Sequence, residues 1–349
     1  MSRKGRRPGL VVGYVAATIG GGFALLGGSQ LALIPFLVGL VLIGIGQGGT
    51  NLARYAAADL AEPTDRSKAI SYVVFASTIG AVGGPGLAGM AGELATDLGL
   101  DELVGPYIFG SVFFALAGLV LWIGLRPDPL VLIGGTTSET DDDTGQGFFD
   151  SLSVIMASQR AKLALGGLIV SQAVMVMVMA MTPLHMQEHG HGVGMVGWVL
   201  SAHTAGMFAF APLAGWVSDR FGRVISLMIA GSILMVSTAM TALAGEAPAF
   251  LMFPGLYLLG LGWSFGMVAA SALITEAVPA KDQVSVQGAA DLITSFVSGA
   301  GALGSGLVFT MAGFHILSGI GIVASGMLLV AAFIQARLSA GGRPLTATG

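Results

Sequence analysis

The chain has 349 residues, of which 54% are hydrophobic and 10% are charged, and its formal net charge is −4. A soluble globular domain carries about 25% charged residues, so this composition excludes a protein surrounded mainly by water and indicates one surrounded by lipid. The small net charge argues against nucleic acid as a partner, and the lack of cysteine excludes disulfides and Cys-ligated metals.

Apolar segments long enough to cross a bilayer follow one another along the chain. A span needs about 20 mostly apolar residues, and no long alternating pattern suggests barrel strands, so helices are the expected elements. We therefore expect an all-α membrane protein with about ten transmembrane helices. They are predicted at residues 10–28, 31–53, 69–91, 104–125, 163–184, 193–213, 224–244, 249–275, 284–311 and 314–336.

Basic residues predict how the helices cross the membrane. All 15 Lys and Arg residues fall at the two chain ends or in alternate connections between the predicted helices, on one common side. The positive-inside rule makes that side cytoplasmic. We therefore expect a multi-pass protein of the inner (plasma) membrane, embedded in the lipid bilayer, with both termini in the cytoplasm.

The longest connection, residues 126–162, divides the predicted helices into four and six. Its centre carries Asp141-Asp142-Asp143 among small polar residues and is predicted to be a flexible acidic linker. The predicted domains are an N-terminal bundle at 1–127, a cytoplasmic linker at 128–160, a C-terminal six-helix bundle at 161–338 and a cytoplasmic tail at 339–349.

The two parts contain an internal repeat. The segment Gly39–Gly46 matches Gly255–Gly262 at an offset of 216 residues, and the first four predicted helices repeat the last four. Repeated halves are typical of secondary transporters, whose binding site lies between the halves. The fifth and sixth helices have no partner, so we expect two helices to be missing before Met1. A misplaced start, a fragment and a real truncation are all compatible with this pattern.

Three motifs carry a family resemblance. The segment Gly215-Trp216-Val217-Ser218-Asp219-Arg220-Phe221-Gly222-Arg223 matches G-x-x-x-D-R-x-G-R, the signature loop of the major facilitator superfamily. The segment 80–89 is similar to the antiporter motif of that family's fifth helix, with one Gly replaced by Ala; the residues that match it are Gly80, Gly84, Pro85 and Gly89. Gly46-Gln47-Gly48 resembles part of the fourth-helix motif, although Gly44 replaces its Arg.

The chain thus resembles this superfamily over nearly its whole length, with helices equivalent to the third through twelfth. The resemblance implies alternating access between two bundles and a signature loop that stabilises one state. The implied switch residues are Gly215, Asp219, Arg220, Gly222 and Arg223. Asp219 can accept hydrogen bonds from a helix N-terminus, and the two arginines can pair with carboxylates or cap carbonyls.

The resemblance also implies a transporter for a small molecule, not an enzyme, and no cofactor. The antiporter-like motif favours proton-linked export of drugs or metabolites. The alternatives are an uptake permease for a small metabolite, and an inactive fragment or partner subunit. The sequence does not identify the substrate, the coupling ion or the oligomeric state.

Polar side chains inside the predicted helices are candidates for a proton or substrate pathway. A carboxylate such as Asp291 is costly in lipid and suggests a functional role; the alternative is a hydrated or paired acid near the cytoplasmic mouth. His203 is a possible proton carrier or a packing histidine. Gln47, Asn51 and Gln172 either line the cavity or hydrogen-bond between helices.

A histidine-rich connection resembles a metal site. His185, His189 and His191 lie close together in the sequence, beside Glu188. Loop histidines flanked by glycine are poorly organised ligands, so metal transport or sensing is the less favoured interpretation.

Overall fold

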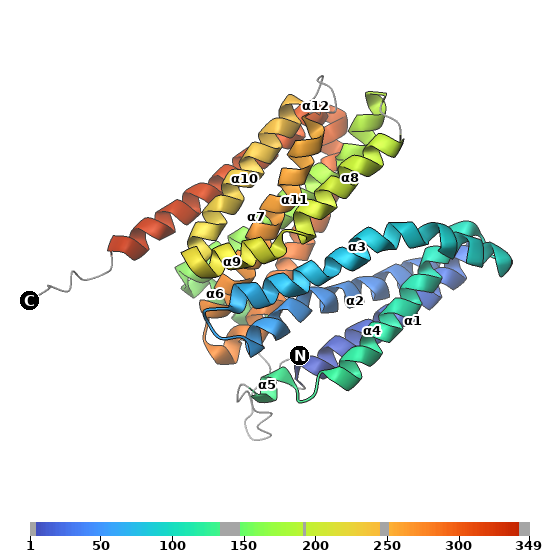
Figure 1. Ribbon diagram of the computed structural model, residues 1–349, viewed down its shortest axis with the longest axis horizontal. Helices are drawn as coiled ribbons and strands as arrows, with labels where there is room; N and C mark the ends of the chain where they lie inside the picture. The colour runs from blue at the N-terminus through green and yellow to red at the C-terminus, as the bar shows by residue number, and fades with distance from the viewer. Residues whose placement is uncertain (1–4, 133–146, 191–192, 245–250, 342–349) are drawn as a thin grey trace, which may run out of the picture. The chain divides into compact units, whose positions relative to one another are not determined.

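The computed structural model of the chain describes residues 5–132, 147–190, 193–244 and 251–341. Every regular element in these ranges is an α-helix or a short 3-10 helix (Figure 1). The helices form two compact units, one of residues 1–60 and 79–147 and the other of residues 61–78 and 148–349. The described residues thus agree with the predicted all-α class.

The first unit is built around α1 (Arg6–Ser29) and α2 (Leu33–Leu60). Glycines let the two backbones approach closely, because a Cβ at Gly20 would lie 2.7 Å from the carbonyl oxygen of Gly39. Small residues at helix contacts are expected in lipid, where close van der Waals packing drives helix association. The other elements of this unit are η1 (Glu102–Val104), α4 (Gly105–Gly124), α5 (Pro129–Leu132) and residues 79–97 of α3 (Arg66–Asp97).

The second unit is built around α11 (Met252–Glu276), which is buried along most of its length. It packs against α7 (Gln159–Glu188), α8 (Val193–Phe208), α9 (Ala211–Phe221) and α10 (Arg223–Leu243). The remaining elements of this unit are residues 66–78 of α3, α6 (Phe148–Ala157), η2 (Ala280–Asp282) and α12 (Gln283–Gly341).

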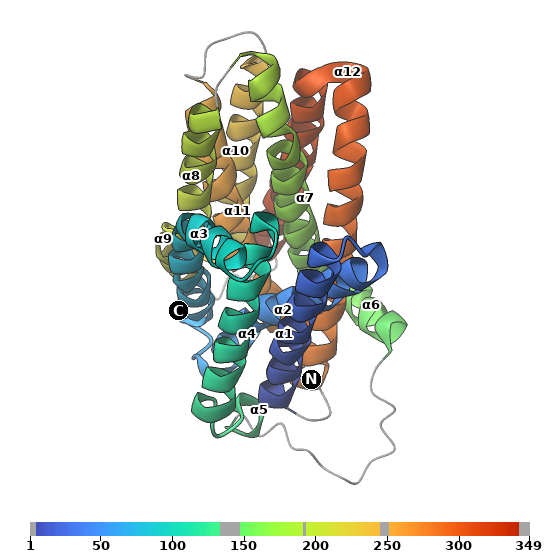
Figure 2. The same ribbon diagram turned by 90° about the vertical axis from the view of Figure 1, so that its right-hand side faces the viewer.

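Helix α12 contains two of the predicted spans. Its two limbs meet in a sharp bend (Figure 2), where Gly313 has φ 79° and ψ 171°. The predicted boundary between 311 and 314 is therefore a single non-helical residue. The opposite happens at the predicted span 193–213, which is divided between α8 and α9.

The predicted count of ten transmembrane helices is not confirmed. Eight segments of the described chain are long and apolar enough to cross a membrane, and one of them is Gln283–Ser339, which contains both limbs of α12. Helix α3 is not among the eight. The expected linker 128–160 also contains more structure than we predicted, because α5 lies at its start and α6 near its end; its acidic centre lies outside the described residues.

Helix α3 belongs to both units. Its residues 66–78 pack with the second unit, whereas residues 79–97 pack with the first. The predicted N-terminal bundle, 1–127, includes residues 61–78. In the structure these residues pack with the C-terminal helices.

Candidate conformational switch at the start of helix α3

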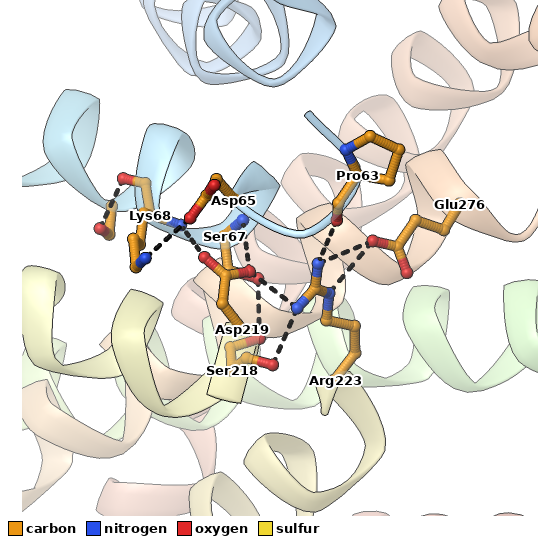
Figure 3. A network of polar contacts seen from close by, with 9 residues as sticks. Pro63, Asp65, Ser67, Lys68, Ser218, Asp219, Arg223 and Glu276 are labelled. Carbon is orange, nitrogen blue, oxygen red and sulfur yellow. Dashed lines mark hydrogen bonds and ion pairs between the residues drawn. The ribbon is translucent and has the colours of Figure 1, made fainter. Parts of the chain in front are cut away.

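The carboxylate of Asp219 caps the first turn of α3 (Figure 3). Its Oδ1 accepts a hydrogen bond from the backbone N–H of Ser67 at 3.1 Å, and its Oδ2 accepts one from the backbone N–H of Lys68 at 2.8 Å. The first N–H groups of a helix have no partner within the helix, and the helix dipole favours an anion there. Asp219 therefore fastens α9 to the start of α3.

Close approach of α9 and α3 depends on Gly215. A Cβ at this position would lie 2.7 Å from the Cβ of Ser71 and 2.9 Å from the carbonyl oxygen of Ser67. The hydroxyls of Ser67 and Ser218 are 2.8 Å apart and share a hydrogen bond. Gly215, the first glycine of the signature, is thus required for the close contact between α9 and α3, which Asp219 stabilises.

Arg223 joins four groups around this contact. Its Nη1 lies 2.7 Å from Oδ1 of Asp219 and donates to the carbonyl oxygen of Ser218 at 2.8 Å. Its Nη2 donates to the carbonyl oxygen of Pro63 at 2.8 Å and to Oε1 of Glu276 at 2.9 Å. The side chain is 8% exposed, so the planar guanidinium, with its several fixed donors, suits this site better than an ammonium group.

Gly222 sets the turn that presents Arg223. It has φ 101° and ψ 152°, ends α9 and precedes α10. This region of backbone conformation is almost restricted to glycine. The second glycine of the signature is therefore a conformational requirement, whereas Gly215 is a packing requirement.

Three further charged residues lie at the edge of the network. Nζ of Lys68 lies 2.7 Å from Oδ1 of Asp65, and both side chains are substantially exposed. The hydrogen bond and the positive charge of Lys68 lower the pKa of Asp65 below its ordinary value. Arg220 is exposed on α9.

The first unit contains a copy of part of this arrangement. Gly5 has φ 92° just before α1, and Nε of the following Arg6 lies 2.8 Å from the buried carboxylate of Asp59 at the end of α2. The pair Arg6–Asp59 thus corresponds to Arg223–Glu276. Sequence reasoning missed both acids, although one offset of 217 residues carries Arg6 onto Arg223 and Asp59 onto Glu276.

A second cap at the first unit was also missed. The carboxylate of Asp128 accepts hydrogen bonds from the backbone N–H groups of Arg6 at 3.1 Å and Arg7 at 2.8 Å. Asp128 therefore binds the start of α1 as Asp219 binds the start of α3. No sequence pattern indicated this contact, because the residues are more than 120 positions apart.

Two of the predicted pathway residues form contacts between helices within the second unit. His203 of α8 is buried, and its Nδ1 lies 2.9 Å from the carbonyl oxygen of Leu256 of α11. The amide oxygen of Gln172 of α7 accepts a hydrogen bond from Nε1 of Trp263 at 2.6 Å. These contacts match the alternative interpretation of interhelical hydrogen bonding.

The other predicted pathway residues are dispersed. Asp291 is half-buried near the start of α12 in the second unit. In the first unit, Gln47 is exposed on α2 and Asn51 is half-buried. The carbonyl oxygen of Asn51 accepts a hydrogen bond from Nη1 of Arg54 at 2.6 Å.

The antiporter-like motif lies along α3. A Cβ at Gly80, Gly84 or Gly89 would meet no described atom within 4 Å, so these glycines do not serve close helix packing in the described chain. Pro85 lies within the helix. The side chain of Pro85 is not among those that the structure describes.

The predicted histidine cluster is only partly visible. His185 and His189 lie at the end of α7, with ring centroids 4.3 Å apart, whereas His191 lies outside the described residues. Among the residues that the structure describes, no three His, Asp or Glu side chains form a group able to hold a metal ion.

The long apolar helices define a multi-pass helical membrane protein. The sequence model of the Major Facilitator Superfamily matches residues 1–158 and 163–347. The chain belongs to the Major Facilitator Superfamily, whose members are transporters and not enzymes. This match covers nearly the whole chain and gives no support to the expected loss of two helices.

Relatives and solved structures agree with this assignment. The chain is 32% identical to the uncharacterized MFS-type transporter YdeG of Bacillus subtilis, over 94% of this chain and 76% of the relative. It is 28% identical to the riboflavin transporter RfnT of Brucella anthropi, over 84% of this chain and 70% of the relative.

Two solved structures illustrate the shared fold. The transporter FucP in its outward conformation superposes with a TM-score of 0.73 at 17% identity, covering 96% of this chain and 84% of that chain. The human organic anion transporter MFSD10 superposes with a TM-score of 0.70 at 18% identity, covering 95% and 78%.

Proposed function

We propose that this protein carries out secondary active transport of a small molecule by alternating access, and that transport is proton-linked export. The observation that carries this proposal is the double hydrogen bond from Ser67 and Lys68 to Asp219. It fastens the start of α3, a helix that continues into the other unit.

Breaking this contact is the proposed switching step. A hydrogen bond to a charged group contributes about 1.5–3 kcal/mol, so two of them hold enough free energy to change a two-state ratio by a factor of roughly 100 or more. When α3 leaves Asp219, Arg223 keeps its ion pair with Glu276, so α10 and α11 stay joined while the conformation changes.

Asp291 is the proposed proton carrier. Its half-buried position at the start of α12 lets it exchange protons with water while remaining inside a helical bundle, where an ionisable group is costly without a function. His203 is the second candidate, although its hydrogen bond to Leu256 restricts the ring. Gln47, Asn51 and Gln172 are proposed to contact the substrate, Gln172 in a state that releases its side chain from Trp263.

The proposal is tested by transport in proteoliposomes with an imposed proton gradient. We expect Asp219→Ala to reduce transport at least 10-fold and Asp291→Asn to remove its dependence on the gradient. Asp65→Ala serves as the matched control, because the exposed carboxylate of Asp65 binds the side chain of Lys68 and not Asp219. Gradient-independent transport by the unaltered protein would contradict proton coupling.

An uptake permease is the second candidate, and one relative suggests a substrate for testing the direction. The Brucella relative is named a riboflavin transporter, so riboflavin is the first substrate to test. Net accumulation of riboflavin against its gradient into cells would favour uptake, whereas loss from preloaded cells would favour export. Binding without transport by the purified chain would favour the third candidate, a fragment or partner subunit.

The proposed orientation places both termini in the cytoplasm of a bacterium, with the chain in the plasma membrane. Since the sequence contains no cysteine, single cysteines can be introduced without removing any native ones. We expect a membrane-impermeant maleimide to label Asp101→Cys in intact cells and to label Thr64→Cys only after lysis. The reverse pattern would overturn this orientation.

A further inference from the structure

A cavity lies where the end of α7 meets the bend of α12. Its volume is about 490 Å³, and it is separate from the Asp219 contact, which lies on α9. It brings three of the five histidines of the chain together with one carboxylate and two phenylalanines. The lining residues are Leu184, His185, Glu188, His189, Phe309, Thr310, Gly313, Phe314 and His315.

Two imidazoles face each other in this cavity. His185 lies in the last turn of α7 and His189 is the C-cap residue of that helix. Their ring centroids are 4.3 Å apart with planes at 53°. The ring of His185 stacks on Phe314 at 4.3 Å and 8°. Phe314 thereby fixes His185 against α12.

The ring of His189 is oriented as a ligating histidine usually is. Its Nδ1 lies 2.8 Å from the carbonyl oxygen of His185. Metal-binding histidines commonly donate one ring N–H to a backbone carbonyl, which fixes the tautomer and leaves the other nitrogen for the metal. Nε2 is therefore the ligating nitrogen expected of His189.

The charges of the lining select a cation over an anion. Glu188 is acidic, and none of the nine lining residues is Lys or Arg. Neutral imidazole suits Zn²⁺, Cu²⁺ and Ni²⁺, whereas Mg²⁺ and Ca²⁺ prefer sets of oxygen ligands. His315 brings a third imidazole from α12.

We propose that this cavity binds one divalent first-row transition-metal ion through His185 and His189. Glu188 or His315 completes the ligand set by turning toward the pair. This movement is required because the described residues contain no group of three such side chains already arranged around one point. Both completing side chains are exposed, so they can turn without repacking the core. The site is independent of the transport direction and coupling proposed above.

Metal binding by the purified protein tests this proposal directly. The protein, carrying a tag without histidine, is titrated in detergent with Zn²⁺ against a chromophoric chelator and with Co²⁺ by visible absorption. The lack of cysteine removes thiolate ligands from both measurements. We expect one equivalent to bind, and affinity to fall at least 10-fold in His189→Ala, in line with the loss of a ligand.

His189→Ala is the main variant because His189 is exposed, whereas replacing the buried His185 can disturb folding. Its fold is checked by gel filtration and thermal unfolding. Gln187→Ala, at an exposed neighbour on α7 that is not among the described lining residues, is the matched control and should bind as the unaltered protein does. No stoichiometric binding, unchanged binding in His189→Ala, or displacement by equimolar Ca²⁺ would each overturn the proposal. If the protein binds the metal as expected but does not transport, the proposed function is contradicted and the metal site is not.

Discussion

Oδ2 of Asp219 lies 2.8 Å from the backbone nitrogen of Lys68, so a side chain of α9 holds the first turn of α3. The contact uses the backbone of Lys68, and the side chain of Lys68 binds Asp65 instead. The contact between Asp219 and the start of α3 can therefore be altered separately from the exposed ion pair Asp65–Lys68.

Removing the carboxylate should release the start of α3. In Asp219→Ala, the N–H groups of Ser67 and Lys68 lose their shared acceptor, at a cost of roughly 2–5 kcal/mol. The buried Ser67 can be replaced by cysteine as a reporter. We expect its maleimide labelling to be at least 10-fold faster in Asp219→Ala. Asp65→Ala is the control and should change the labelling little; equal labelling in all three backgrounds would disprove the role of the cap.

Replacing Gly222 should destabilise the protein through the backbone alone. A Cβ at this residue meets no described atom within 4 Å, but φ is 101°, and such strain costs about 1–3 kcal/mol. We expect Gly222→Ala to lower the thermal unfolding temperature in detergent. Gly166→Ala, at an equally open helical position, should leave the temperature unchanged or raise it.

Arg223 should not tolerate lysine. An ammonium group cannot reproduce the fork that reaches Asp219, Glu276 and the carbonyl oxygen of Pro63. We expect Arg223→Lys to cost about 2–4 kcal/mol of unfolding free energy, less than the roughly 3–5 kcal/mol for removing one partner of a buried pair, because lysine keeps the positive charge. The cost should be less than additive with Glu276→Gln, and Arg220→Lys is the control. Full additivity would mean that the two residues do not interact.

The sequence predicted the all-α class and located the signature loop, because both depend on local patterns. Apolar length indicates a helix, and the spacing of Gly215, Asp219, Gly222 and Arg223 matches the signature loop. The partners of that loop could be identified only from the structure, since Glu276 and Pro63 lie 53 and 160 positions away from Arg223 in the sequence. The predicted boundary between 311 and 314 coincides with the bend at Gly313, whereas the count of ten is not confirmed, since α3 is not among the eight long apolar segments of the described chain.

The pair Asp65–Lys68 should titrate without affecting the switch. The hydrogen bond and charge of Lys68 lower the pKa of Asp65, so any stabilisation is present above the ordinary aspartate pKa and is lost as the pH falls through the lowered value. Lys68→Gln should raise the pKa of Asp65 toward its ordinary value, measured by NMR of labelled aspartate. Because the pair is exposed, unfolding at neutral pH should not change; an unshifted pKa would contradict the pairing.

Packing between α8 and α11 should be sensitive to one methyl group. A Cβ at Gly260 would overlap the carbonyl oxygen of His203 and lie 2.8 Å from the backbone nitrogen of Met207. Overpacking of this kind costs about 1–3 kcal/mol, so Gly260→Ala should lower the unfolding temperature. Gly197→Ala on α8, where a Cβ meets no described atom within 4 Å, is the control that should not.

Helix α3 runs for 32 residues, about 48 Å at 1.5 Å per residue. Pro85 lies within it, and a proline in a helix interior removes one backbone hydrogen bond and favours a kink. The helix therefore carries, between the end held by Asp219 and the end at Asp97, a position at which it can flex.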